Sequence, residues 1–131
     1  MLLDTHALIW WQLGIRHLSA RARRELARAR KVLISPVSCW ELAVLVRKQR
    51  IALDREVLRW IGDVFAQERV DLAPLTATAA ASAGLLGADF RGDFTDRLLY
   101  ATARELGVPF LTKDEAIQSF AIAAGDVRTI W

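Results

Sequence analysis

Cysteine is nearly absent from this chain of 131 residues, which contains only Cys39. A single thiol cannot form an intrachain disulfide, so the fold must be held by its core, as is usual in the reducing cytosol. We interpret Cys39 as a small buried apolar residue and not as a reactive thiol. Histidine is also scarce, and His6, His17 and Cys39 form no recognisable set of zinc ligands.

Long apolar runs are missing as well. None reaches the roughly 18 residues that a membrane-spanning helix needs. The N-terminal segment Met1–Asp4 lacks the charged and hydrophobic regions of a signal peptide. Repeats, low-complexity segments and interdomain linkers are absent too. We therefore expect one cytoplasmic domain covering residues 1–131, without a membrane span.

Hydrophobic residues, by contrast, make up 53% of the chain, and the mean hydropathy is +0.21. This is ample for one core and high for a small soluble monomer, which predicts a buried partner surface. We expect a homodimer and an apolar groove for a partner segment. The tryptophans on predicted helices are the candidates, with the core as the alternative for each: Trp10, Trp11, Trp40 and Trp60.

Positive charge is concentrated in one segment. The segment Arg16–Lys31 holds seven Lys and Arg residues and one acid, a net charge of +6, so the remainder of this +3 chain sums to −3. A basic segment beside an acidic remainder indicates a polyanionic partner. The alternative is a solvated helix face.

Short apolar runs alternate with helical patterns along the chain. We expect strands at Met1–Asp4, Val32–Ile34, Val70–Leu72, Val108–Leu111 and Val127–Ile130. Expected helices are Thr5–Gln12, Ser19 to about Ala29, Ser35 to about Gln49, Asp54 to about Gln67, Thr76–Leu86, Asp93–Leu106, and a short one after a capping box at Thr112–Glu115. This alternation predicts an α/β fold, a three-layer α/β/α sandwich with a mostly parallel central sheet.

Acidic residues recur where the predicted strands end. Asp4 follows the first strand and Glu41 lies in the helix after the second. Asp96 lies in the helix before the fourth strand, and Asp114 follows that strand. Ligands of open parallel sheets bind at the carboxyl ends of the strands. We therefore expect these four carboxylates to lie close together.

Each acid also has a purely structural interpretation. Asp4 and Asp114 could cap helices, and Asp96 could pair with Arg97, the next residue. Glu41 is harder to explain in this way, because it lies in the otherwise apolar segment Cys39–Val46. A charge buried there needs a partner or a metal ion.

Several carboxylates in one pocket repel each other and take up protons at neutral pH. A divalent cation relieves this repulsion, and oxygen ligands alone suit Mg²⁺ or Mn²⁺. Such a pocket at the ends of strands is suited to phosphate chemistry.

Four segments resemble the motifs of PIN-domain proteins, and within that family the VapC-like toxins of bacterial toxin–antitoxin pairs. They are Leu2–Trp10, Ser35–Leu42, Asp93–Leu99 and Leu111–Asp114. The resemblance implies that Asp4, Glu41, Asp96 and Asp114 bind metal and catalyse. One departure is Phe94, where many relatives have proline; it affects how the helix starts and the role of Asp93. Asp93 fits the N-cap of that helix, which places Asp96 at N3, one turn further along.

The resemblance implies a Mg²⁺- or Mn²⁺-dependent endoribonuclease whose partners are RNA and a cognate antitoxin. Residues expected to support the four acids are Thr5, Ser38, Asp93 and Thr112. Basic residues expected to hold the RNA backbone are Arg21, Arg23, Arg24 and Arg28.

Three alternatives remain beside the toxin. A phospho-accepting receiver domain needs paired acids after the first strand, whereas Asp4 stands alone. A PIN fold that only binds a partner is disfavoured by the presence of all four acids. A PIN nuclease of RNA maturation is less consistent with the small size of the chain.

Overall fold

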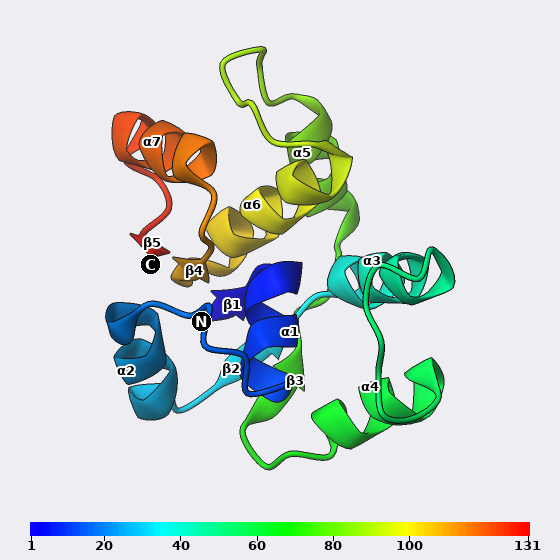
Figure 1. Cartoon of the computed structure of the whole chain (residues 1–131). Coiled ribbons are helices and arrows are strands. Elements are labelled where there is room, and N and C mark those ends of the chain that lie inside the picture. The colour runs from blue at the N-terminus through cyan, green and yellow to red at the C-terminus, as the bar shows by residue number, and fades with distance from the viewer.

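The computed structural model describes residues 1–131, with a five-stranded parallel sheet through its centre (Figure 1). The strands are β1 (Leu2–Leu3), β2 (Val32–Ile34), β3 (Val70–Leu72), β4 (Phe110–Leu111) and β5 (Thr129–Ile130). They lie in the order β3-β2-β1-β4-β5, and every neighbouring pair is parallel. All five predicted strands are confirmed, although three are shorter at their ends than expected, as short strands often are.

Seven helices accompany the sheet. They are α1 (Thr5–Gln12), α2 (Ala20–Arg28), α3 (Pro36–Arg47), α4 (Val57–Phe65), α5 (Ala77–Gly84), α6 (Phe94–Leu106) and α7 (Glu115–Ala124). Helices α1, α2 and α4 pack on one face of the sheet, and α5, α6 and α7 pack on the other. Helix α3 contributes Leu42 to the first side and Val37 to the second. The predicted three-layer α/β/α sandwich is confirmed.

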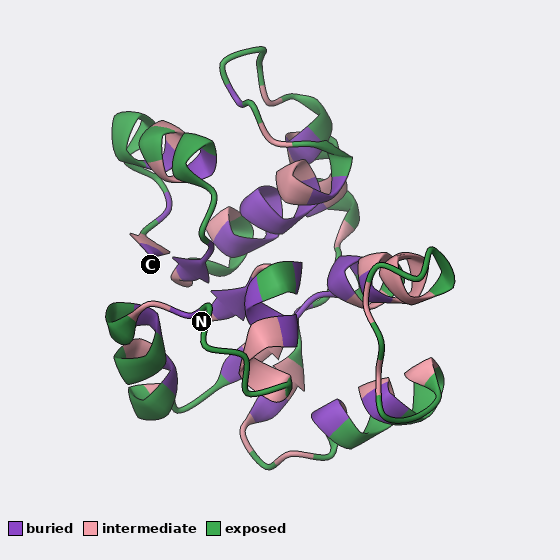
Figure 2. Ribbon diagram, in the orientation of Figure 1, coloured by how far each residue is buried: buried purple, intermediate pink, exposed green.

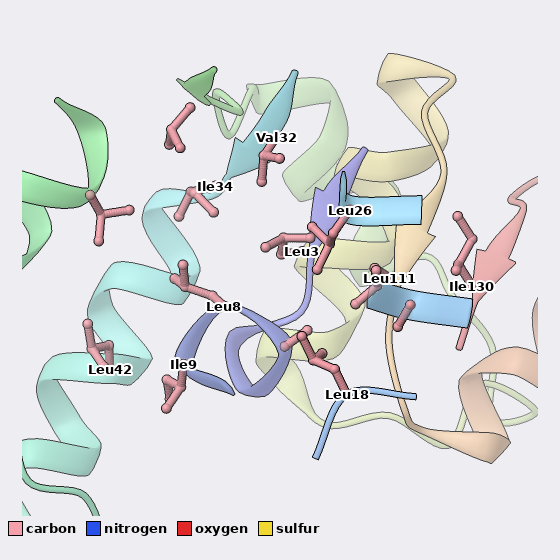
Figure 3. Close-up of a cluster of buried hydrophobic side chains, with 14 of the residues drawn as sticks. Leu3, Leu8, Ile9, Leu18, Leu26, Val32, Ile34, Leu42, Leu111 and Ile130 are labelled. Carbon is pink, nitrogen blue, oxygen red and sulfur yellow. The ribbon is translucent and has the colours of Figure 1, made fainter. Parts of the chain in front are cut away.

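The sheet separates two hydrophobic clusters because successive strand residues point to opposite faces. Leu3 and Leu111 enter the cluster with α1, α2 and α4, which Figure 3 shows in close-up. Leu2 and Phe110 enter the cluster with α5, α6 and α7. All four side chains are fully buried. Strands β1 and β4 therefore have apolar cover on both faces, and the sequence becomes polar only where they end.

Two helix starts differ from the prediction. Helix α4 begins after Glu56, whose carboxylate accepts from the N–H groups of Leu58 and Arg59, and not at Asp54. Asp54 is instead paired with Arg55. The predicted capping box that begins at Thr112 is also wrong, because Asp114 is the N-cap of α7.

The tryptophans differ in burial, and most of α2 is exposed. Trp60 is buried in the core, whereas 61% of Trp40 is exposed. On α2 the buried residues are Ala22 and Leu26, so nearly all of its surface faces outward (Figure 2). No helix in the structure has both the length and the apolar character needed to cross a membrane.

Candidate active site

Carboxylates from four separate segments line one pocket of about 460 Å³, here called the acidic pocket. Its lining residues are Asp4, His6, Trp10, Glu41, Asp93, Asp96, Lys113 and Asp114. Asp4 and Asp114 come from the loops after β1 and β4, so the pocket lies at the carboxyl ends of the central strands. All four acids expected to converge therefore do so.

Asp4 is held from two sides. Its Oδ1 accepts from the backbone N–H of His6 at 3.1 Å, which caps α1. Its Oδ2 accepts from the Thr112 hydroxyl at 2.7 Å. Burial raises the pKa of Asp4 above its ordinary value, although both hydrogen bonds act in the opposite direction. Asp4 therefore both caps α1 and lines the acidic pocket.

Two threonines orient the acids. The Thr112 hydroxyl donates to Asp4 and accepts from the backbone N–H of Asp114 at 3.1 Å, so it joins two acids from different segments. The Thr5 hydroxyl donates to Glu41 Oε2 at 2.6 Å. Both threonines are fully buried. The charge of Glu41, unexplained within its apolar stretch, has a hydrogen-bond partner from the neighbouring helix.

Asp93 and Asp96 form a reciprocal capping box at the start of α6. Asp93 Oδ1 accepts from the N–H of Asp96 at 3.0 Å, and Asp96 Oδ2 accepts from the N–H of Asp93 at 2.9 Å. Asp93 also accepts from the Thr95 hydroxyl at 2.8 Å. This places Asp93 at the N-cap and Asp96 one turn further along, as the sequence predicted.

The environments of these two carboxyls move their pKa values apart. Burial, together with the nearby charges of Asp93 and Asp4, raises the pKa of Asp96 to about 7, although the hydrogen bond that Asp96 accepts from the N–H of Asp93 acts in the opposite direction. Burial also acts on Asp93, but the hydrogen bonds from Asp96 and Thr95 outweigh it, so the pKa of Asp93 is lowered. Asp96 is thus the acid whose ionisation the pocket disfavours.

Arg97 does not neutralise Asp96. Its guanidinium donates to the carbonyl oxygens of Leu86, Gly87 and Phe90, at 2.6, 3.3 and 3.0 Å. It also lies over the Phe90 ring, 5.5 Å from the centroid. The ion pair considered as an alternative for Asp96 is therefore wrong, because the arginine is committed to the loop before α6.

Other predicted residues lie outside the acidic pocket. Ser38 is fully buried on α3, and its hydroxyl has no hydrogen-bond partner. Among the four predicted RNA-binding arginines, Arg23 lines a neighbouring groove and Arg28 a hollow on another part of the surface. The remaining two, Arg21 and Arg24, are exposed on α2. The four arginines therefore share no single pocket.

Three lining residues were missed by the sequence reasoning. His6 and Trp10 lie one turn apart on α1, with ring centroids 5.6 Å apart. The Lys113 ammonium lies 5.8 Å from the Trp10 ring centroid. All three belong to segments already singled out for their acids, and the i, i+4 spacing of His6 and Trp10 places these two on one face of α1. Lys113 is the only Lys or Arg that lines the acidic pocket.

The residues of the acidic pocket fit a hard divalent cation that keeps much of its water. No three His, Cys, Asp or Glu side chains are close enough together to enclose an ion on their own. Mg²⁺ dehydrates reluctantly and is usually held by one or two carboxylates with several waters. Asp4 and Asp96 are close enough for the charge of Asp4 to raise the pKa of Asp96. Cation binding would relieve this unfavourable charge.

Comparison with known proteins agrees with this arrangement. The family model of the PIN domain matches residues 1–123. Ribonuclease VapC22 of Mycobacterium tuberculosis is 37% identical over 119 residues, which cover 91% of this chain and 90% of that protein.

Solved structures share the fold. VapC20 of Mycobacterium tuberculosis, described as a toxin that cleaves the sarcin–ricin loop, superimposes with a TM-score of 0.65 at 22% identity, covering 96% of this chain and 95% of that chain. A toxin–antitoxin complex from Klebsiella pneumoniae matches with a TM-score of 0.64 at 18% identity, covering 90% and 89%.

Proposed function

This chain belongs to the PIN-domain family, and from that premise we propose that it is a divalent-metal-dependent endoribonuclease acting as the toxin of a toxin–antitoxin pair. The observation that carries the proposal is the convergence of Asp4, Glu41, Asp96 and Asp114 on one pocket. The similarity to a named ribonuclease over nine-tenths of the chain supports the choice of RNA as substrate.

Within the acidic pocket, Asp4 and Asp96 would hold Mg²⁺ or Mn²⁺, and Glu41 and Asp114 would complete the ligand field through water. When bound, the cation supplies activation of a water and stabilisation of the charge that develops on the phosphate during hydrolysis. The donor set supports this choice, because oxygen ligands without a histidine cluster suit these two ions.

The chain's own residues prepare the site. Thr112 fixes Asp4, and Thr5 fixes Glu41, so two carboxylates need little reordering before they bind. Asp96, with a pKa of about 7, is partly protonated at neutral pH, and in its ionised form it would bind the cation. Lys113 offers the pocket's one ammonium group to a non-bridging phosphate oxygen of the substrate.

The test is cleavage of RNA by metal-stripped protein, with and without added Mg²⁺ or Mn²⁺. We expect no cleavage in chelator, recovery with either ion, and loss of cleavage in Asp114→Asn. Glu115→Gln is the matched control, because Glu115 is the next acid along the chain and does not line the pocket. Full activity in chelator would overturn the metal mechanism, and absence of cleavage with every ion would leave a binding module.

We also propose a cognate antitoxin as the protein partner. The Klebsiella structure is a complex of a toxin with its antitoxin and shares the fold, which supports this proposal. Expression of the chain alone should arrest bacterial growth, and expression together with the product of a neighbouring antitoxin gene should restore it. Growth unharmed by expression of the active chain alone would reject the toxin role.

A homodimer is the third part of the proposal. Trp40 and Phe94 are 61% and 71% exposed and line the same apolar hollow between α3 and α6. Covering two large side chains of this kind favours self-association. Light scattering at micromolar concentration should give twice the monomer mass, and Trp40→Ser should lower it. A wild-type monomer at that concentration would reject the dimer.

A further inference from the structure

A second hollow, here called the arginine groove, lies beside the acidic pocket. It has a volume of about 490 Å³ and is formed by α1, α2 and the loop between them. Its apolar walls include Trp10, Trp11 and Leu26, and three arginines lie along it: Arg16, Arg23 and Arg69. No carboxylate lines the arginine groove. The acidic pocket has the opposite composition, with five acids and one lysine.

Trp10 is the one residue that lines both hollows. The centroid of its ring lies 5.3 Å from the centroid of the His17 ring, which is on the α1–α2 loop. The Lys113 ammonium lies 5.8 Å from the same Trp10 centroid. Trp10 therefore borders both the acids and the arginines. A chain that crosses the acidic pocket meets Trp10 before it reaches the arginine groove.

The arrangement resolves an electrostatic difficulty of the proposed nuclease. A phosphodiester strand is a polyanion, and the five carboxylates of the acidic pocket repel it wherever a cation does not neutralise them. Binding must then come from phosphates on either side of the one that is cut. The arginines of the groove, which no carboxylate lines, provide that binding, and the exposed parts of the half-buried Trp10 and Trp11 rings can contact unpaired bases.

We propose that the arginine groove binds the single-stranded RNA segment next to the scissile phosphate, with a base against Trp10 or Trp11 and phosphates on the arginines. This proposal rests on the nuclease function proposed above and names the site that holds its substrate. It replaces the four helix arginines expected from the sequence with a different set, of which only Arg23 was predicted.

The three arginines have different roles in the groove. Arg23 donates to the Leu18 carbonyl at 2.6 Å, and Arg69 donates to the Leu26 carbonyl at 2.8 Å and lies over the Trp11 ring. These two are held by the protein and shape the groove. Arg16 is exposed and makes no hydrogen bond or ion pair, so its guanidinium is available to a phosphate.

The experiment compares Arg16→Gln with Arg24→Gln. Both remove one exposed guanidinium that has no partner in the protein, but Arg24 lies on α2 outside the groove. The probe is fluorescent single-stranded oligouridylate, and its binding is followed by anisotropy in chelator, so that no strand is cut. We expect Arg16→Gln to reduce the slope of log affinity against log salt by about 0.7, the value for one phosphate contact on a single strand. Arg24→Gln should leave the slope unchanged.

An abasic strand with the same number of phosphates tests the stacking. Wild-type protein should bind it about fivefold more weakly or worse, because one base on an aromatic ring contributes at least that factor. Equal binding of the two strands, or equal slopes for the two variants, would overturn the proposal. If Arg16→Gln leaves RNA binding intact and weakens binding of the cognate antitoxin, the groove belongs to a protein partner and the proposal is wrong.

The binding assay and the cleavage assay fail independently. If wild-type protein cuts RNA but the two variants bind it alike, the groove assignment is wrong and the nuclease remains. If binding depends on Arg16 but no added ion restores cleavage, the RNA site remains and the nuclease is wrong.

Discussion

The Thr112 hydroxyl donates to Asp4 Oδ2 at 2.7 Å, across 108 positions of sequence. The hydroxyl oxygen of Thr112 also accepts from the backbone N–H of Asp114 at 3.1 Å. One side chain at the end of β4 thus orients an acid at the end of β1 and the acid that begins α7. This is possible because β1 and β4 are paired neighbours, with Leu3 beside Leu111.

Thr112→Val should impair the site without unfolding the protein. Valine keeps the shape, but Asp4 loses a hydrogen bond that favours its charged form, so its pKa should rise further. We expect about 10- to 100-fold weaker metal affinity or cleavage, which is typical of losing a group that orients a ligand. Cleavage rate against Mg²⁺ concentration measures this effect.

Thr102→Val is the control for that substitution. Thr102 is equally buried, and its hydroxyl donates only to the Leu98 carbonyl within α6, at 2.7 Å. It should keep the metal dependence of wild-type cleavage. Equal effects of the two variants on metal affinity would show that Thr112 has no special relation to Asp4.

Arg97→Lys should destabilise the chain although the charge is unchanged. A lysine cannot reproduce the fork that reaches the carbonyls of Leu86, Gly87 and Phe90. We expect a loss of about 2 kcal/mol in the free energy of unfolding, the scale of a hydrogen bond to a charged group. Denaturant unfolding measures it.

The comparison for Arg97 is Arg104→Lys. Arg104 lies 3.4 Å from Asp126 in a partly exposed ion pair, which a lysine can replace at a cost within about 1 kcal/mol. If the two variants are equally stable, the loop before α6 does not depend on Arg97.

Much of this arrangement was predictable because it follows from local signals. Apolar runs predicted all five strands, and acids after those runs predicted the carboxylates that share the acidic pocket. The spacing of Asp93 and Asp96 predicted their N-cap and N3 positions, because helix phase is fixed by sequence separation.

The remaining features depend on packing between distant segments. The sequence does not say whether Trp60 is buried or Trp40 exposed, since both lie on helices with apolar neighbours. Which arginines of α2 line the arginine groove depends on which side of that helix faces α1. The start of α4 was misplaced because Asp54 and Glu56 can both cap a helix. In the structure Asp54 forms an ion pair with Arg55, and Glu56 is the cap.

Without metal, the stability contribution of Asp96 should fall as pH rises. Its pKa is about 7 in the folded chain against an ordinary value of 3.8, so the folded state binds the proton more tightly. The contribution is complete below about pH 4 and is lost as pH rises to about 7. In chelator, the Tm of Asp96→Asn minus that of wild type should therefore grow across this range and level off above it.

An acid outside the pocket provides the control for this prediction, and added metal should remove the destabilisation of wild type. Asp89→Asn removes an exposed carboxyl outside the pocket and is measured alongside as the control for the loss of one negative charge. Saturating Mg²⁺ should raise the Tm of wild type at pH 8 and leave Asp96→Asn nearly unchanged. A Tm difference for Asp96→Asn that does not vary with pH would contradict the raised pKa.

Asp93 and Asp96 should fail in different ways when each is replaced. Asp93→Ala removes the oxygen that accepts from the N–H of Asp96 and from the Thr95 hydroxyl. Loss of such a cap costs about 1 kcal/mol, and much of the cleavage should remain. Asp96→Asn keeps an oxygen that can accept from the N–H of Asp93, so the helix start survives. It removes the charge that would hold the cation, so nearly all cleavage should be lost.

The two variants are measured together, by Tm in chelator and by cleavage rate with Mg²⁺. Both residues line the acidic pocket, so position alone does not separate them. Their electrostatics do, because hydrogen bonds lower the pKa of Asp93 while burial and neighbouring charges raise that of Asp96. A cation beside Asp96 would relieve the repulsion that helps to raise its pKa. If Asp93→Ala proves inactive while Asp96→Asn cuts RNA, the cation sits against the other end of the capping box and the site must be redrawn around Asp93.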